Sequence, residues 1–145
     1  MKKSDYHKPE RLADVMALIQ VLALAEDARR SEKGLGDDLQ RYPQSAESWT
    51  QLAEGHPEFF RVRAPDARGN TDVYRISLIA RAVVPKGDED HREALSSDLL
   101  GKLLDIAISL HDRDKARTDQ WKSLLPIAGA IVAGLFAIAA ALLKR

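Results

Sequence analysis

Apolar residues recur at helical spacing through the first third of the chain and predict three helices. Residues 9–30 carry them around much of the helix surface, which indicates a long helix at the centre of the core. A short second helix ends before Pro43, because proline disfavours helical geometry in the residue that precedes it. Ser45 is a suitable N-cap for a third helix over residues 45–55.

The pattern then changes to two short runs that are rich in β-branched and aromatic residues. Residues 59–63 predict one strand and residues 73–84 predict a second. Turn-forming residues fill positions 65–70, so the two strands are expected to form a β-hairpin with a long loop. Three helices followed by a hairpin predict a small α+β domain over residues 1–85.

A further helix is predicted from about residue 93, after a capping box over residues 90–93. It carries a stripe of apolar residues at spacings of four, three and four. A stripe this short fits either a dimerising coiled coil or packing of the helix on its own domain. Charges of both signs alternate over residues 111–122 and predict a solvated stalk, so residues 86–122 form a second region. The stripe consists of Leu99, Leu103, Ile106 and Leu110.

The end of the chain has the length and composition of a membrane span. Residues 124–143 contain no charged side chain, although 30% of the chain is charged. Twenty helical residues extend about 30 Å, which is the thickness of the hydrocarbon core of a bilayer. We therefore predict a single transmembrane helix in a third region, residues 123–145, with Trp121 and Lys122 at the interface.

Basic residues on the two sides of this span predict its orientation. Four basic residues lie in positions 113–122 and only Lys144 and Arg145 follow the span, which places the N-terminal domain in the cytoplasm. A secretory signal is the alternative, because two lysines near the N-terminus precede an apolar run over residues 15–25. Three acidic residues ahead of that run argue against the signal.

Small residues four positions apart recur along the predicted transmembrane helix. Such ridges let helices approach closely and self-associate in a membrane. Alanine is also abundant here, so the spacing fits either self-association or chance. The span contains no ionisable residue, which argues against ion conduction. The small residues are Gly129, Ala130, Ala133, Gly134 and Ala137.

Composition and motifs argue against catalysis. The chain has 22 basic and 22 acidic side chains, no net charge and no cysteine, which excludes disulfides and thiolate chemistry. Its four histidines have no second ligand at metal-binding spacing, and it contains neither a glycine-rich phosphate loop nor a nucleophile-elbow serine. We therefore predict no catalytic residue, no metal, no cofactor and no enzymatic activity.

The order helix, short helix, helix and hairpin over residues 9–84 resembles the winged helix-turn-helix superfamily. The resemblance lies in the order and lengths of the elements and in the placement of turns. It implies that residues 45–55 correspond to the helix that enters the DNA major groove in the family. It also implies that residues 59–84 form the wing, with a tip at Arg68-Gly69-Asn70.

The third helix departs from what DNA binding requires. It contains Glu47 and Glu54 and no lysine or arginine, whereas reading bases and holding phosphates needs basic donors. The wing carries five arginines, the last of them Arg81, which fit DNA phosphate, lipid headgroups, an acidic protein or plain solvent exposure. The predicted partner-binding residues are Trp49, Gln51, Arg61, Arg63, Arg68 and Arg75.

These observations predict a non-enzymatic, membrane-tethered module that recruits or senses a cytoplasmic protein. The lipid bilayer is the second expected partner, and a homo-oligomer is a third. Two alternatives remain: a membrane-perturbing effector with an oligomerising span, and a membrane-anchored DNA-binding regulator. The acidic third helix disfavours the latter.

Overall fold

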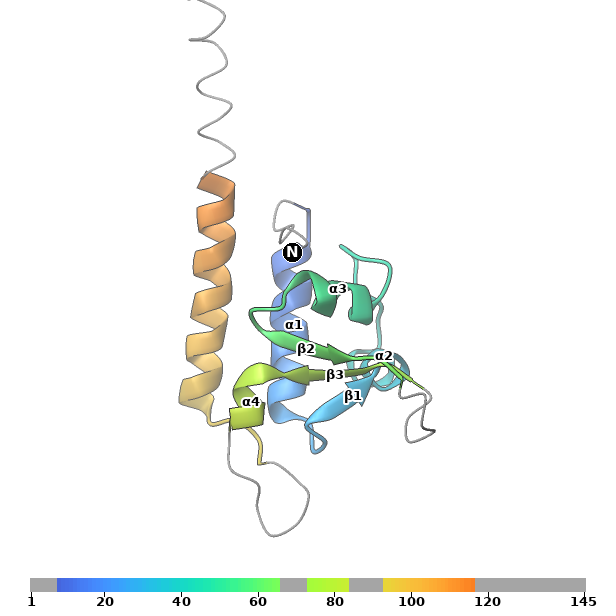
Figure 1. Ribbon diagram of the computed structural model, residues 1–145. Coiled ribbons are helices and arrows are strands. Elements are labelled where there is room, and N and C mark those ends of the chain that lie inside the picture. Colours follow the sequence, from blue (N-terminus) through green and yellow to red (C-terminus); the bar gives the residue numbers. More distant parts are fainter. Residues whose placement is uncertain (1–7, 66–72, 84–92, 117–145) are drawn as a thin grey trace, which may run out of the picture. The chain divides into compact units, whose positions relative to one another are not determined.

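The computed structural model describes residues 8–65, 73–83 and 93–116 of the chain (Figure 1). Within these residues, five helices and a three-stranded antiparallel sheet form an α+β fold, which confirms the predicted class. The chain divides into two compact units, Met1–His111 and Asp112–Arg145. The described secondary structure lies in the first unit, apart from the last residues of the fifth helix.

The elements follow one another closely along the chain. The first helix ends earlier than predicted, and a short strand precedes the second helix. They are α1 (Arg11–Leu24), β1 (Arg29–Ser31), α2 (Glu32–Leu39), α3 (Trp49–Gly55), β2 (Phe60–Arg63), β3 (Arg75–Leu78), α4 (Ile79–Val83) and a fifth helix over residues 97–116.

The sheet has the strand order β1-β3-β2, and β3 pairs antiparallel with both neighbours. Alternate residues of the hairpin point into the core, where Phe60, Ile76 and Leu78 are buried. In Figure 1, α1 runs behind the sheet and covers this face. On the opposite face of the sheet, Arg61 and Arg63 are exposed within the described residues, and Arg75 and Ser77 are half-buried.

The part of the fifth helix that lies in the first unit packs on the core of that unit through one side. The backbone N–H of Leu95 donates to the carbonyl of Ala23 over 3.0 Å, which ties the start of this segment to the end of α1. Ala107 is fully buried in the core. The predicted stripe is divided, because Leu103 and Leu110 pack against the core whereas Leu99 and Ile106 are exposed. Packing on its own domain therefore accounts for two of the four stripe residues.

Several predicted boundaries are wrong at positions where a side chain has another partner. The third helix begins at Trp49, and the hydroxyl of Ser48 rather than of Ser45 caps it by accepting from the N–H of Gln51. The second wing strand ends at Leu78, and the residues predicted to extend it form α4. Strand β1 was not predicted because three residues are too short for a periodic pattern.

A buried carboxylate holds the loop after α2 against α1. Asp14 of α1 is fully buried and accepts hydrogen bonds from the backbone N–H groups of Gln44 and Ser45, each over 2.8 Å. The Ser45 hydroxyl donates over 2.7 Å, and the guanidinium of Arg41 donates over 2.8 Å. These four bonds explain why Ser45 is not available as a helix cap.

A buried arginine donates hydrogen bonds to the carbonyls at the other end of α1. The guanidinium of Arg81, in α4, donates to the carbonyls of Leu22, Ala25 and Glu26 at the C-terminus of α1, and to the carbonyl of Glu93. A cation suits this end of a helix, where the last carbonyls lack partners within the helix. Arg81 was predicted to be one of the surface arginines of the wing, and the structure corrects this because its side chain is 1% exposed.

The structure leaves the predicted membrane segment untested. Among the described residues, no helix combines the length and apolar character needed to cross a membrane. The predicted span at 123–145 lies outside the described residues, with its small residues Gly129, Ala130, Ala133, Gly134 and Ala137. The predicted wing tip with Arg68 and the predicted capping residues 90–92 also lie outside them.

Candidate anion-binding face

Strand pairing gathers four arginines on the solvent face of the sheet. Arg29 of β1 and Arg61 of β2 both pair with Ser77 of the central strand. Arg75 lies two residues before Ser77 on β3, and it pairs with Arg63 of β2 and with Ser31 of β1. Paired residues, and residues two apart in a strand, share a face of the sheet. We call Arg29, Arg61, Arg63 and Arg75 the arginine face.

None of these four arginines forms an ion pair or a side-chain hydrogen bond within the described residues. Arg30 lies between them in sequence but points to the other side of β1. There its guanidinium lies 3.1 Å from the carboxylate of Asp38 and 3.5 Å from that of Asp27. The contrast shows that described acidic residues compensate the neighbouring arginine but not the arginine face.

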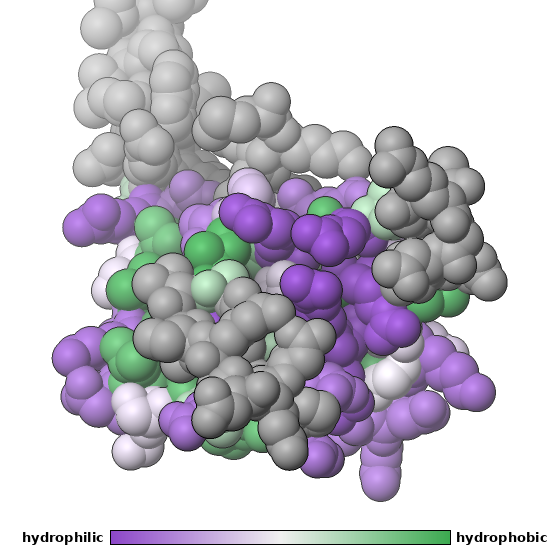
Figure 2. Space-filling model, turned by 60° about the horizontal axis from the view of Figure 1, so that its bottom comes forward, coloured by the Kyte–Doolittle hydropathy of each residue, from purple (hydrophilic) through white to green (hydrophobic). Residues whose placement is uncertain are grey.

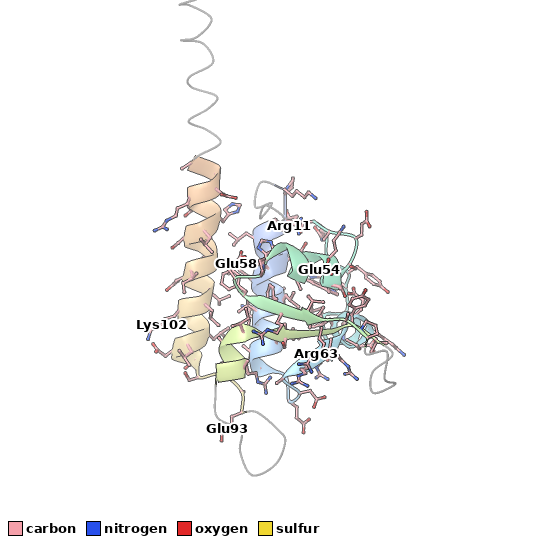
Figure 3. The ribbon with its side chains drawn as sticks, in the orientation of Figure 1. Arg11, Glu54, Glu58, Arg63, Glu93 and Lys102 are labelled. Atoms are coloured by element: carbon pink, nitrogen blue, oxygen red, sulfur yellow. The ribbon has the colours of Figure 1, made fainter. Side chains whose placement is uncertain are left out.

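The arginine face is hollowed by a pocket of about 250 Å³. All four arginines line it together with Ser77, and the apolar residues Ala28, Leu78, Ile79 and Ala82 complete the wall. The pocket is therefore basic on the strand side and apolar toward α4. Figure 3 shows Arg63 at the end of β2, whereas Lys102 lies on the fifth helix, away from the strands.

The pairing of Arg63 with Arg75 places two like charges directly opposite each other, which destabilises a sheet. We expect Arg63→Glu to raise the free energy of unfolding by about 1 kcal/mol, because it replaces a repulsive cross-strand pair by an attractive one. Urea titration of the full chain in mild detergent measures this. Lys102→Glu is the matched charge reversal on the fifth helix and should lower stability slightly, because Lys102 pairs with Asp98 over 2.7 Å. A loss of stability in Arg63→Glu would contradict the expectation.

The two candidates on the third helix have structural contacts. Trp49 is fully buried in the core, and its indole N–H donates to the carbonyl of Arg41 over 3.3 Å. The guanidinium of Arg41 also lies 5.6 Å from the centre of the Trp49 ring. Gln51 is exposed, but its side-chain oxygen accepts from the N–H of Glu47 over 2.8 Å beside the start of α3. Trp49 is thus a core residue and not a surface for a partner.

The arginine face therefore contains three of the predicted binding residues and one that sequence reasoning missed. Arg61, Arg63 and Arg75 come together as the hairpin predicts, and Arg68 lies outside the described residues. Arg29 was missed because it reaches the face only through the unpredicted strand β1. The adjacent basic residues Arg29 and Arg30 are a weak sequence signal that one of them faces solvent.

A wider depression lies on another part of the surface. It measures about 1180 Å³ and includes residues of α2, the start of α3 and the two ends of the loop between β2 and β3. Its lining mixes both charge signs, with Lys33 and Asp37, and adds the exposed rings of Tyr42 and Tyr74. Without a dominant charge or a convergent set of polar groups, it does not indicate a particular ligand.

The described surface favours recognition through charge. On the face that Figure 2 shows, hydrophilic residues make up most of the described part, and hydrophobic ones come to the surface in small groups. Among the described residues, no group of three or more histidine or acidic side chains could hold a metal ion. The arginine face is thus the strongest candidate site of the described part of the chain.

Comparison with known proteins finds no matching family model, no similar curated protein and no similar solved structure. What the chain binds is therefore inferred from its own residues.

Proposed function

We propose that the chain is a non-enzymatic interaction module that is tethered to a membrane and binds an acidic partner through the arginine face. The arginine face carries the proposal. Four cations share one exposed surface of a chain whose formal net charge is zero, and no described carboxylate compensates them. Such an uncompensated patch lowers stability through repulsion and is favoured when it attracts a negatively charged ligand.

In this proposal the domain is winged-helix-like, and the arginine face includes both strands of the wing. The order α1, α2, α3 and the β2–β3 hairpin supports the resemblance, with β1 added as a third strand. Helix α3 contributes little to binding, because Trp49, Leu52 and Ala53 are buried and the helix contains no basic residue. The partner surface is therefore the wing and β1 rather than the third helix.

The membrane tether in this proposal is the uncharged segment over residues 124–143. Its length supports a single transmembrane helix, and the basic residues before it support a cytoplasmic domain. A tether raises the local concentration of the arginine face near other membrane components, so a weak charge-based interaction becomes sufficient for recruitment.

Carbonate extraction tests the tether. Membranes from cells that express the full chain should retain it after washing at alkaline pH. A variant with Val132→Arg and Leu135→Arg should be released, because two charges at the centre of the span oppose insertion. Protease added to sealed inside-out vesicles should remove the N-terminal domain. Release of the unaltered chain by carbonate, or digestion only from the outer side, would contradict the tether or its orientation.

Binding of a labelled polyglutamate peptide tests the arginine face. Full chain in phosphatidylcholine nanodiscs should bind the peptide at low salt, and binding should weaken as ionic strength rises. The double variant Arg61→Gln/Arg75→Gln should lose most of this binding, while Lys102→Gln should retain it. Equal binding by both variants would show that the arginine face is not the acidic-partner surface.

A further inference from the structure

We infer that the pocket in the arginine face binds a doubly charged phosphate group, carried either by a lipid headgroup or by a soluble phosphorylated molecule. This inference rests on the proposed function and names the chemistry of its acidic partner. The evidence lies in the size of the pocket, in the number of its cations and in the kind of donor that surrounds it.

The size of the pocket favours a compact ligand group. At about 250 Å³ it is smaller than the roughly 300–1,000 Å³ of pockets that enclose drug-sized ligands. It admits one small polar group and leaves the rest of a larger molecule outside. An extended acidic peptide would use only a single carboxylate inside such a pocket.

The number of cations favours phosphate over carboxylate. Four arginines line the pocket, whereas one carboxylate carries a single negative charge. A phosphomonoester carries about −1.5 to −2 charges near neutral pH and presents three strong acceptor oxygens. It therefore compensates more of the positive charge in the same volume.

The type and placement of the donors fit the same group. Guanidinium is planar and donates two parallel hydrogen bonds to phosphate oxygens, which a lysine cannot do. The arginines come from all three strands, and they rather than Ser77 supply the donors, because the Ser77 hydroxyl donates to the carbonyl of Arg61 over 3.4 Å. Ile79 and Ala82 give the pocket an apolar side against which the carbon part of an ester can pack.

Calorimetric titration with inorganic pyrophosphate tests the inference on the full chain in phosphatidylcholine nanodiscs. We expect binding that is at least about tenfold weaker in Arg61→Gln/Arg75→Gln, because one lost charge-assisted hydrogen bond already corresponds to about a factor of ten. Lys102→Gln should bind like the unaltered chain. Both variants should fold, since the double variant removes like charges at the exposed Arg61 and the half-buried Arg75, and Lys102 is an exposed helix residue.

Nanodiscs that contain phosphatidic acid, a phosphomonoester, distinguish the two sources. A lipid source predicts that they weaken pyrophosphate binding, while phosphatidylglycerol, a phosphodiester, does so much less. A soluble source predicts that neither lipid competes. Either pattern supports a phosphate site.

The inference is overturned if pyrophosphate binds no better than a glutamate peptide of equal charge. In that case arginine-dependent peptide binding would leave the proposed function standing. It is also overturned if the double variant binds pyrophosphate as well as the unaltered chain, or if a DNA duplex binds the arginines more tightly than pyrophosphate, which would assign the face to nucleic acid.

Discussion

Replacing Asp14 by alanine should lower the free energy of unfolding by about 3 to 5 kcal/mol, because it removes a buried carboxylate that pairs with the partly exposed Arg41 and leaves several donors without an acceptor. Asp14 is fully buried and accepts four hydrogen bonds, from Arg41, Gln44 and twice from Ser45. A loss of this size is a large part of the roughly 5 to 15 kcal/mol that stabilises a domain.

Asp14→Asn should be nearly as harmful although it keeps the size of the side chain. An amide carries no charge to pair with Arg41, and its NH₂ group would face the N–H groups of Gln44 or Ser45. Asp98→Asn is the matched control, because that carboxylate is exposed and, within the described part of the chain, pairs with Lys102 alone, one helical turn away. We expect the control to lose about 0.5 kcal/mol or less.

Urea titration followed by tryptophan fluorescence measures these changes. The chain has two tryptophans, and in a Trp121→Phe background the emission reports on Trp49 alone. Trp49 is buried beside Arg41, so its emission should shift when the Asp14 network opens. A loss of less than about 1 kcal/mol in Asp14→Ala would show that the network contributes little to stability.

The acid dependence of stability gives a second measurement of the same group. Burial alone raises the pKa of Asp14, but the hydrogen bonds from Ser45, Arg41 and Gln44 outweigh it and hold the pKa below the ordinary value of 3.8. The unfolded chain therefore binds the proton more readily than the folded protein. The contribution of Asp14 is complete above the ordinary pKa and disappears as the pH falls from 3.8 through the folded pKa. The stability difference between the unaltered chain and Asp14→Asn should shrink over that range and remain constant above about pH 5.

The hairpin could be predicted from the sequence because its evidence is local. Alternation and turn residues define β2 and β3 without reference to the rest of the chain. The α+β class follows from that pattern together with the helical spacing before it, and the hairpin pattern alone places Arg61, Arg63 and Arg75 in the two strands. Their register on β3 then brings them together on one face.

The parts that could not be predicted depend on contacts between distant segments. Arg29 joins the face only because β1 pairs with β3. Ser45 has the residue type of a helix cap, but Asp14, far away in sequence, accepts its hydrogen bonds instead. Arg81 lies in an apolar stretch that favours a strand by composition, and its role at the end of α1 overrides that preference.

Replacing Arg81 by methionine should lower the free energy of unfolding by about 3 kcal/mol or more, although methionine preserves most of the buried volume. The guanidinium donates to carbonyls at the end of α1 and to the carbonyl of Glu93, and all of these would lose a charged donor. Arg81→Lys should rescue only a part, because one ammonium group cannot reach carbonyls on several sides.

Arg61→Met is the matched control, since it makes the same substitution in β2, at an arginine of the arginine face. Because Arg61 is exposed and has no described ionic partner, we expect its loss to leave stability unchanged or to raise it slightly. Hydrogen exchange should locate the effect: amides in the last turn of α1 should exchange faster in Arg81→Met and not in Arg61→Met. If both variants were equally stable, Arg81 would contribute no more to the free energy of unfolding than the arginines that face solvent. The expected contrast separates Arg81, which stabilises the domain, from Arg61, Arg63 and Arg75, whose side chains remain free to bind a ligand.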